Sequence, residues 1–137
     1  IAGDGPQKEN IKQNIKDLNI SSNIRLLGHV NQIPELLCAI DIFVLSSDSK
    51  EGVPQSVMQA LFMNKMVVAT RSGSTEDLPI NKNFQIVDTD NINSLVDGVS
   101  YFIENESQGE TRSKMINSFS STIMVEKILK VYNSILR

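Results

Sequence analysis

Residues 42–70 read IFVLSSDSKEGVPQSVMQALFMNKMVVAT, and this stretch decides the fold. Two short apolar runs, 42–46 and 66–70, enclose a polar loop and a segment with helical spacing, 54–63. A continuous apolar run between polar residues, such as 42–46, is typical of a strand buried on both faces. Two such strands joined through a helix by short connections predict a parallel sheet covered by helices.

The rest of the chain repeats this alternation of strands and helices. The apolar pair before the glycine turn at 3–6 resembles the end of a strand whose beginning is missing. Further strands are expected at 24–28 and 84–87, and helices at 11–18, 33–39, 92–103 and 119–137. One buried face is expected for the helix at 92–103, formed by Ile92, Leu95, Val96, Val99, Phe102 and Ile103. The predicted fold is α/β: one domain over residues 1–137, with a Rossmann-like parallel sheet and helices on both faces.

Composition narrows the functional classes. The net charge of −3 and the pI near 5.1 give no basic footprint, so nucleic acid is not an expected ligand. No apolar run approaches a bilayer span and no signal peptide is recognisable, which favours the cytoplasm. The single cysteine, Cys38, lies in an apolar context and is expected to be buried and inert. The sequence shows no metal-ligand pattern, and His29 is its only histidine.

In parallel sheets of this kind, ligands bind beyond the carboxyl ends of the strands. The loops to search are therefore 3–6, 28–30, 46–54 and 71–77, where glycine, serine and acidic residues are found. The first loop reads GDGP, and its glycines let a backbone approach a phosphate at the start of a helix. Lys8 stands where a dinucleotide fingerprint needs its third glycine, so a plain strand–helix turn remains equally open.

The loop before the helix at 54–63 carries the richest chemistry. Pro54 suits the first helical position, so the amides of Gln55 and Ser56 are among the unsatisfied donors of the first turn. Gly52 permits close approach, and Glu51 can accept hydrogen bonds from sugar hydroxyls. Donors for an anion beside an acceptor for hydroxyls suit a phosphorylated sugar. The alternative, that Glu51 only complements the helix dipole, stays open.

The blocks GDGP, IRLLGHV, AIDIFVLSS, EGVPQSVMQAL and VVAT, in this order, resemble the family 4 retaining glycosyltransferases. The match covers nearly the whole chain and includes a closing helix, FSSTIMVEKILKVYNSIL (119–136), and EGVPQSVMQAL is its most specific block. The resemblance implies the C-terminal, nucleotide-sugar-binding half of a GT-B enzyme. It also implies that an acceptor-binding N-terminal domain belongs to the full-length protein and is absent from these residues.

The resemblance assigns roles to particular residues. Glu51 matches the first acid of the family's Glu-x7-Glu motif and is the catalytic candidate, expected to hold hydroxyls of the transferred sugar. The expected contacts to the donor sugar and diphosphate are Gly52, Val53, Pro54, Gln55 and Ser56. The expected nucleotide contacts are Gly3, Gly5, Leu27, Gly28, His29 and Gln59. No metal or other cofactor is implied, because helix N-termini and basic side chains stabilise the leaving diphosphate.

The chain departs from the family pattern at several positions. Gln59 stands where a second acid normally grips the ribose, and Asn64 stands at the helix end where glycine is usual. The implied partners are a nucleotide-sugar donor and a glycan or lipid acceptor, with peripheral membrane association of the full-length protein as a further expectation. We expect residues 1–137 alone to bind donor weakly and transfer nothing. The rival readings are a non-catalytic binding or interaction module, a nucleotide-sugar epimerase and a dinucleotide-binding domain.

Overall fold

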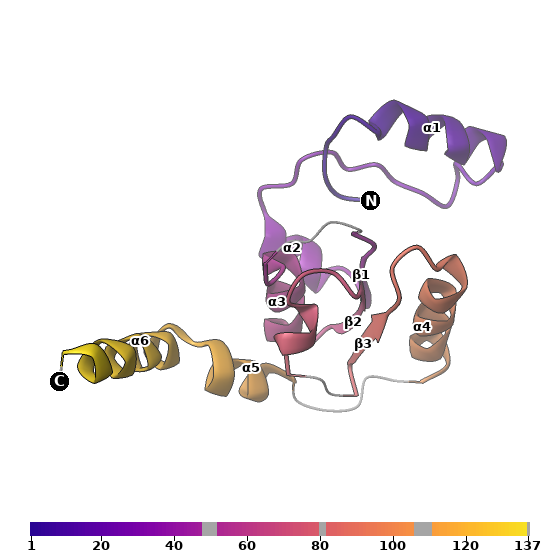
Figure 1. Ribbon diagram of the computed structural model, residues 1–137. Helices are drawn as coiled ribbons and strands as arrows, with labels where there is room; N and C mark the ends of the chain where they lie inside the picture. Colours follow the sequence, from indigo (N-terminus) through magenta and orange to yellow (C-terminus); the bar gives the residue numbers. More distant parts are fainter. Residues whose placement is uncertain (48–51, 80–81, 106–110, 137) are drawn as a thin grey trace. The chain divides into compact units, whose positions relative to one another are not determined.

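The computed structural model describes residues 1–47, 52–79, 82–105 and 111–136 (Figure 1). The chain divides into two compact units, Ile1–Leu36 and Leu37–Arg137, and each is described by itself. The boundary falls within α2 (Ile33–Cys38), which begins with proline in its first turn as predicted.

The first unit is built around a short parallel contact and one helix. Ala2 pairs with Gly28 as an isolated bridge, and the Gly3 amide donates to the Gly28 carbonyl at 2.7 Å. The strand predicted at 24–28 is therefore wrong: of these residues, only Gly28 forms a bridge. α1 (Lys8–Asp17) follows the glycine turn. It corresponds to the helix expected at 11–18 but begins three residues earlier.

Two helices end in the same way, with asparagine in the left-handed region. Asn19 follows α1 with φ 55°, and Asn64 follows α3 (Gln55–Phe62) with φ 58°. At Asn64 two amides turn back onto the helix: Asn64 N–H to the Leu61 carbonyl and Lys65 N–H to the Ala60 carbonyl, both at 3.0 Å. This is the Schellman pattern, in which asparagine substitutes for the more usual glycine. The capping role predicted for Asn64 is confirmed.

The second unit contains a three-stranded parallel sheet in the order β1-β2-β3. Its strands are β1 (Ile42–Leu45), β2 (Met66–Thr70) and β3 (Phe84–Val87), with Ile42 opposite Met66 and Val67 opposite Phe84. The predicted parallel sheet with helices is confirmed, and the two C-terminal strands start and end where the sequence placed them.

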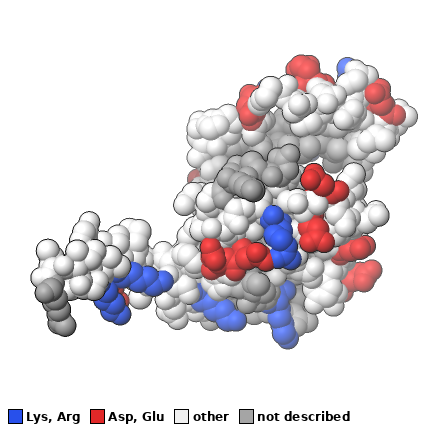
Figure 2. All heavy atoms as spheres, viewed as in Figure 1, with Lys and Arg blue, Asp and Glu red and all other residues white. Residues whose placement is uncertain are grey.

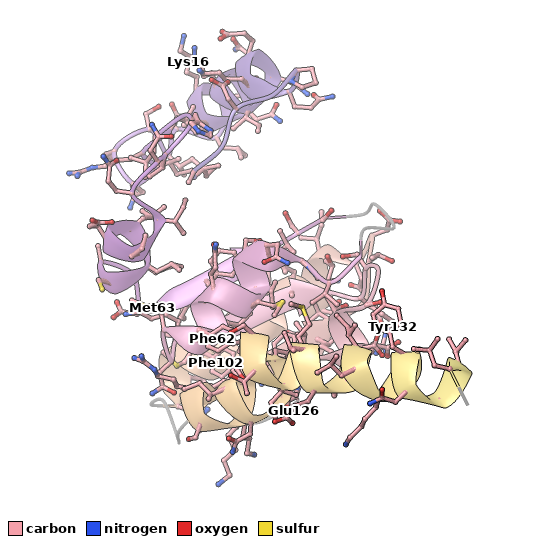
Figure 3. All side chains as sticks on the ribbon, turned by 90° about the vertical axis from the view of Figure 1, so that its left-hand side faces the viewer. Lys16, Phe62, Met63, Phe102, Glu126 and Tyr132 are labelled. Atoms are coloured by element: carbon pink, nitrogen blue, oxygen red, sulfur yellow. The ribbon has the colours of Figure 1, made fainter. Side chains whose placement is uncertain are left out.

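Helices α3 and α4 (Ile92–Glu104) contact the sheet from its two sides (Figure 1). The central strand carries the core: Val67, Val68 and Ala69 are each fully buried. Full burial of an aliphatic side chain contributes roughly 1.5–3 kcal/mol, so β2 is the strand that anchors both helices. Phe102 of α4 packs with Val68 in one cluster and lies inside the second unit (Figure 3).

Three burial predictions are wrong. Val44 of β1 is 43% exposed, because α3 and α4 pack mainly on β2 and cover β1 less. In α4 the predicted single apolar face splits: Leu95, Val99 and Phe102 face the core, and the other three are exposed, namely Ile92, Val96 and Ile103. Cys38 is exposed, and its neighbour Leu37 fills the buried position at the end of the short α2.

Glycine at position 98 sets how closely α4 approaches the sheet. A Cβ placed there would lie 2.9 Å from Val68 Cγ1 and 3.1 Å from Val87 Cγ1. Both valines are stiff, branched side chains in the core, so neither can move away at low cost. Gly98 therefore permits a helix–sheet distance that alanine would not.

The C-terminal segment forms two helices, of which the sequence predicted one. α5 (Thr111–Phe119) was missed because its composition is mostly polar, and only Thr111 and Met115 are buried. α6 (Ser121–Ile135) starts at Ser120, whose hydroxyl accepts from the Ile123 amide at 3.4 Å. None of the α6 residues is buried, and Tyr132 and Glu126 point to opposite sides of the helix (Figure 3).

A polar junction joins α3, β3 and α5. The Asn64 Oδ1 atom accepts from the Thr111 amide at 2.8 Å, so the residue that ends α3 also caps the start of α5. Behind it, the buried Asn83 side chain donates to Thr111 Oγ1 at 3.3 Å, and the Asn83 carbonyl accepts from Val67 N–H at 2.7 Å. Buried polar groups of this kind hold their elements in register because each needs its partner.

The replacement Asn64→Gly should lower the free energy of unfolding by about 1 kcal/mol, although glycine suits the backbone better, because the Thr111 amide loses its cap. Urea unfolding of the 137-residue chain measures this change. Asn19→Gly is the matched control, since Asn19 occupies the same position in its motif and the described residues give its side chain no hydrogen bond. Equal effects of the two substitutions would show that the Asn64 side chain has no such role.

Candidate functional site

The N-terminus of α3 lies in the loop region that the sequence singled out. Pro54 is the N-cap rather than the first helical residue: its ψ of 116° is extended, and its carbonyl accepts the Met58 amide at 3.1 Å. The Met58 amide makes the first hydrogen bond of the helix, so the amides of Gln55 and Ser56 lie before it in the first turn. No side-chain cap is described for α3. This correction leaves the predicted donors in place, because the first turn still offers N–H groups to an anion.

Side chains of α3 divide between core and surface. Val57, Ala60 and Leu61 are fully buried, whereas Gln55 and Gln59 are exposed one turn apart on the other side of the helix. The two glutamines therefore share the surface that follows the cap, as their spacing predicts. Contact of Gln59 with a ribose stays a prediction, and Glu51 lies outside the described residues. Gly52 is exposed and Val53 is half-buried.

The glycine turn of the first unit borders a pocket of about 350 Å³. Gly3, Gly5 and Gly28 line it together with apolar side chains that include Ile11 and Leu26. Gly3 has φ 126° and Gly28 has φ 64°, conformations that suit glycine. A Cβ at any of the three glycines would meet nothing within 4 Å, so the glycines leave the pocket open. The structure thus brings together three of the predicted nucleotide contacts.

Two further predicted nucleotide contacts flank Gly28 without being among the residues that line this pocket. Leu27 is 47% exposed, and its amide donates a hydrogen bond to the Ile1 carbonyl at 2.9 Å. His29 is exposed, with Nε2 3.0 Å from Asn31 Oδ1. Their nucleotide role stays a prediction.

Charged side chains lie beside the glycine pocket. Lys8 Nζ is 3.2 Å from Asp4 Oδ2, and Asp4 Oδ1 accepts from the Gly5 amide at 3.2 Å. The hydrogen bond and the charge of Lys8 lower the pKa of Asp4 below its ordinary value. One turn on, Lys12 lowers the pKa of Glu9 in the same way. Lys8, which stands in place of the third glycine of a dinucleotide fingerprint, lines the pocket and places a cation there.

The carboxyl edge of the sheet carries a second cavity of about 300 Å³, called here the edge groove. Its lining residues come from the ends of all three strands and the start of α4: Ser46, Ser47, Thr70, Asp88, Asp90, Asn91, Ile92 and Leu95. The edge groove was not predicted from the sequence, because the loop after 84–87 is not among the four loops in which a ligand was expected. The acidic run DTD immediately after that strand was the available signal.

An ion-pair cluster borders the edge groove. Arg71 follows β2, pairs with Glu76 and lies 3.7 Å from Asp88 through Nε to Oδ1. The Arg71 amide also donates to the Val87 carbonyl at 2.7 Å, so Arg71 ties the ends of β2 and β3 together. On the face shown in Figure 2, basic side chains likewise lie beside acidic ones. The next residue, Ser72, is buried, and its hydroxyl has no hydrogen-bond partner among the described residues.

The described residues contain neither a metal-binding cluster nor a membrane-spanning helix. No group of three or more histidine, cysteine, aspartate or glutamate side chains in the described ranges is placed to hold a metal ion. No helix within the described part of the chain combines the length and apolar character that crossing a bilayer requires.

Residues 1–120 match the family model described as Glycosyl transferases group 1. The chain belongs to this family. The resemblance of EGVPQSVMQAL and its neighbouring blocks to GT-B glycosyltransferases is thereby confirmed, over most of the chain's length.

Two relatives among the group 1 glycosyltransferases illustrate the match. A poly(ribitol-phosphate) alpha-N-acetylglucosaminyltransferase of Staphylococcus aureus is 28% identical over 141 residues, covering 98% of this chain and 28% of the relative. The UDP-Gal:alpha-D-GlcNAc-diphosphoundecaprenol alpha-1,3-galactosyltransferase of Escherichia coli is 30% identical over 138 residues, covering 96% of this chain and 35% of the relative. The chain thus spans about a third of the length of these relatives.

A solved glycosyltransferase structure shares the fold. Anabaena HepE in complex with UDP superposes with a TM-score of 0.86 at 19% identity, covering 97% of this chain and 40% of HepE. HepE has also been crystallised with UDP-glucose, and that complex gives a TM-score of 0.85. At this identity the likeness shows the GT-B fold of the group 1 domain.

Replacing Lys8 should raise the pKa of Asp4 toward its ordinary value, because Lys8 supplies both its hydrogen bond and the larger charge effect. Carboxyl chemical shifts followed by NMR against pH in Lys8→Gln measure this. The lowered pKa means that the pair favours the folded state above the ordinary pKa of aspartate and loses this effect as the pH falls through the pKa of the folded state.

Lys12→Gln is the matched control. It should raise the pKa of Glu9 and leave Asp4 nearly unchanged, since Lys12 is only a minor influence on Asp4. If the pKa of Asp4 stayed the same in Lys8→Gln, the two side chains would not be paired in solution.

Proposed function

We propose that this chain is the donor-binding part of a glycosyltransferase that moves a sugar from a nucleotide diphosphate to an acceptor with retention of configuration. The single observation that supports it most is the family match over residues 1–120, which includes both the glycine pocket and the start of α3. These are the two places where the residues present suit a nucleotide and a diphosphate.

The pocket of the first unit suits the nucleoside. About 350 Å³ lies at the small end of ligand-pocket volumes, enough for a base and part of a ribose. Ile11 and Leu26 supply apolar surface for a base, and Gly3 and Gly28 let backbone groups come close without a Cβ in the way. We assign the nucleotide to this pocket, with Leu27 and His29 beside it.

The start of α3 suits the diphosphate and the sugar. Uncapped N–H groups in the first turn of a helix favour negative charge, and the amides of Gln55 and Ser56 are placed for this. Gly52 and Val53 precede the cap, and Glu51 is assigned to sugar hydroxyls as the catalytic residue of this part of the enzyme. The contacts proposed for the nucleotide thus lie in the first unit, and those proposed for the diphosphate and sugar lie in the second.

The proposed reaction needs no nucleophile from this chain. In transfer with retention, the acceptor hydroxyl attacks C1 of the sugar on the face that the diphosphate leaves. A diphosphate oxygen takes the proton of that hydroxyl, so the sugar gains the acceptor oxygen as it loses the diphosphate oxygen. The helix N-terminus stabilises the charge that develops on the leaving group. No metal is assigned to this step.

The acceptor belongs to other parts of the full-length protein. The chain spans 28% and 35% of two relatives whose names specify a ribitol-phosphate polymer and a diphosphoundecaprenol-linked sugar as acceptors. We assign a glycan or lipid-linked glycan as acceptor, and peripheral membrane association and cytoplasmic location to the full-length enzyme. Residues 1–137 alone should bind donor and transfer no sugar.

Gly5→Val tests the nucleotide pocket. The residue lines the pocket, needs no positive φ, and leaves open space at its Cβ position, so valine fills the cavity without straining the fold. Calorimetric titration with UDP should show affinity reduced at least about tenfold, equivalent to roughly 1.4 kcal/mol. Asn10→Val, on the exposed side of α1, should bind UDP as the unchanged chain does. Absence of UDP binding by the unchanged chain would favour the non-catalytic interaction module.

Gln59→Glu should leave UDP affinity equal or improve it, because a carboxylate accepts from both ribose hydroxyls and makes the stronger, charge-assisted bonds. Gln55→Glu is the contrasting variant: it places a carboxylate among the first-turn amides and should weaken binding of the diphosphate. The same titration compares them. A clear loss of affinity in Gln59→Glu would remove position 59 from the ribose site.

A further inference from the structure

None of the residues that line the edge groove has a role in the proposed function, yet the groove lies where ligands of parallel sheets bind. Its lining comes from the carboxyl ends of β1, β2 and β3 and from the first turns of α4. Ligands in α/β sheets bind outside these strand ends. A cavity of about 300 Å³ there can hold a group the size of a sugar ring.

The polar groups of the groove match hydroxyls. Asp88 and Asp90 offer four carboxylate oxygens, and Ser46 offers a hydroxyl that both donates and accepts. Asn91 uses its Oδ1 to cap α4 through the Ser94 amide at 3.1 Å, which leaves its Nδ2 group as a donor at the groove. A sugar hydroxyl also donates and accepts, so a mixed lining of this kind suits it.

The charge of the groove argues against an anion. Its charged lining residues are aspartates, and Arg71, which pairs with the lining residue Asp88, is also paired with Glu76. A phosphate here would meet the two carboxylates, and the lining residues that the structure describes include no Lys or Arg. The groove is therefore a poor diphosphate site, in contrast to the start of α3.

The groove also has an apolar side, and hydrogen bonds join the strand ends that line it. Ile92 is 78% exposed at the start of α4, and Leu95 lies one turn further. Aliphatic side chains of this kind can cover the C–H face of a sugar ring. The Thr70 hydroxyl donates to carbonyls of Leu45 and Ser47, so the end of β2 holds the end of β1 in place. Preorganised polar groups lose less entropy on binding.

We propose that the edge groove is a saccharide subsite, with Asp88 and Asp90 accepting from hydroxyls of a neutral sugar ring that rests on Ile92. This inference rests on the proposed function, because a glycosyltransferase binds sugar rings of this kind. The ring is either the sugar of the nucleotide donor or a unit of a separate glycan, and the chemistry of recognition is the same for both.

An NMR titration of the 137-residue chain tests the proposal with three probes: N-acetylglucosamine, UDP and UDP-N-acetylglucosamine. A saccharide in the groove should shift the amides of Asn91 and Ile92. Asp90→Asn and Ile92→Ala should each weaken this response several-fold, since one loses charge-assisted bonds and the other loses apolar contact. Both side chains are exposed, and asparagine suits the φ of 57° at position 90, so both variants should fold. Asp97→Asn, exposed on α4 outside the groove, is the matched control and should change nothing.

The outcomes separate the two sources of the ring and the two proposals. Shifts with N-acetylglucosamine alone support a glycan unit, and shifts with UDP-N-acetylglucosamine but not with UDP support the donor sugar. The inference is overturned if no saccharide shifts the groove amides at millimolar concentration, or if UDP alone shifts them as much as UDP-N-acetylglucosamine does. Amides of Gly3 and Gly28 report UDP in the first unit independently, so the proposed function can stand when this inference fails.

Discussion

Parallel pairing of β1, β2 and β3 is the constraint on which the second unit depends. Because all three strands run the same way, each loop that follows a strand emerges at one edge of the sheet. The start of α3, the turn after β2 and the acidic loop after β3 are brought to that edge although they are far apart in the sequence. The burial of Val67, Val68 and Ala69 keeps this arrangement fixed, since α3 and α4 both pack on β2.

The fold could be predicted where the sequence pattern and the environment agree. β2 and β3 were predicted to the residue, because each is a short apolar run with a polar boundary. The burial of Val44 and of the exposed half of α4 was predicted wrongly. An apolar side chain favours burial, but the packing of neighbouring elements decides whether it is covered. α5 was missed because its sequence is mostly polar: Met115 is its one buried apolar residue, and the contacts of Asn64 and Asn83 with Thr111 hold its start.

The candidate site shows the same limits. Gly3, Gly5 and Gly28 were found because a ligand loop needs glycine, and the structure places all three around one pocket. The edge groove was missed because its aspartates and serines are ordinary loop residues, and only the sheet brings Ser46 and Asp88 together. The mixture of carboxylates and hydroxyls at the groove contrasts with the bare amides at the start of α3. The two surfaces at this edge of the sheet therefore differ in the hydrogen-bonding groups that they present.

We expect the glycine pocket and the start of α3 to bind the nucleotide diphosphate of a sugar donor. An amide-resolved NMR titration of the 137-residue chain with UDP tests it most directly. Saturable shifts are expected at Gly3, Gly5 and Gly28 in the first unit and at Gln55 and Ser56 at the start of α3. Saturable binding that left these amides unshifted and perturbed other surfaces would contradict it, as would the absence of any binding.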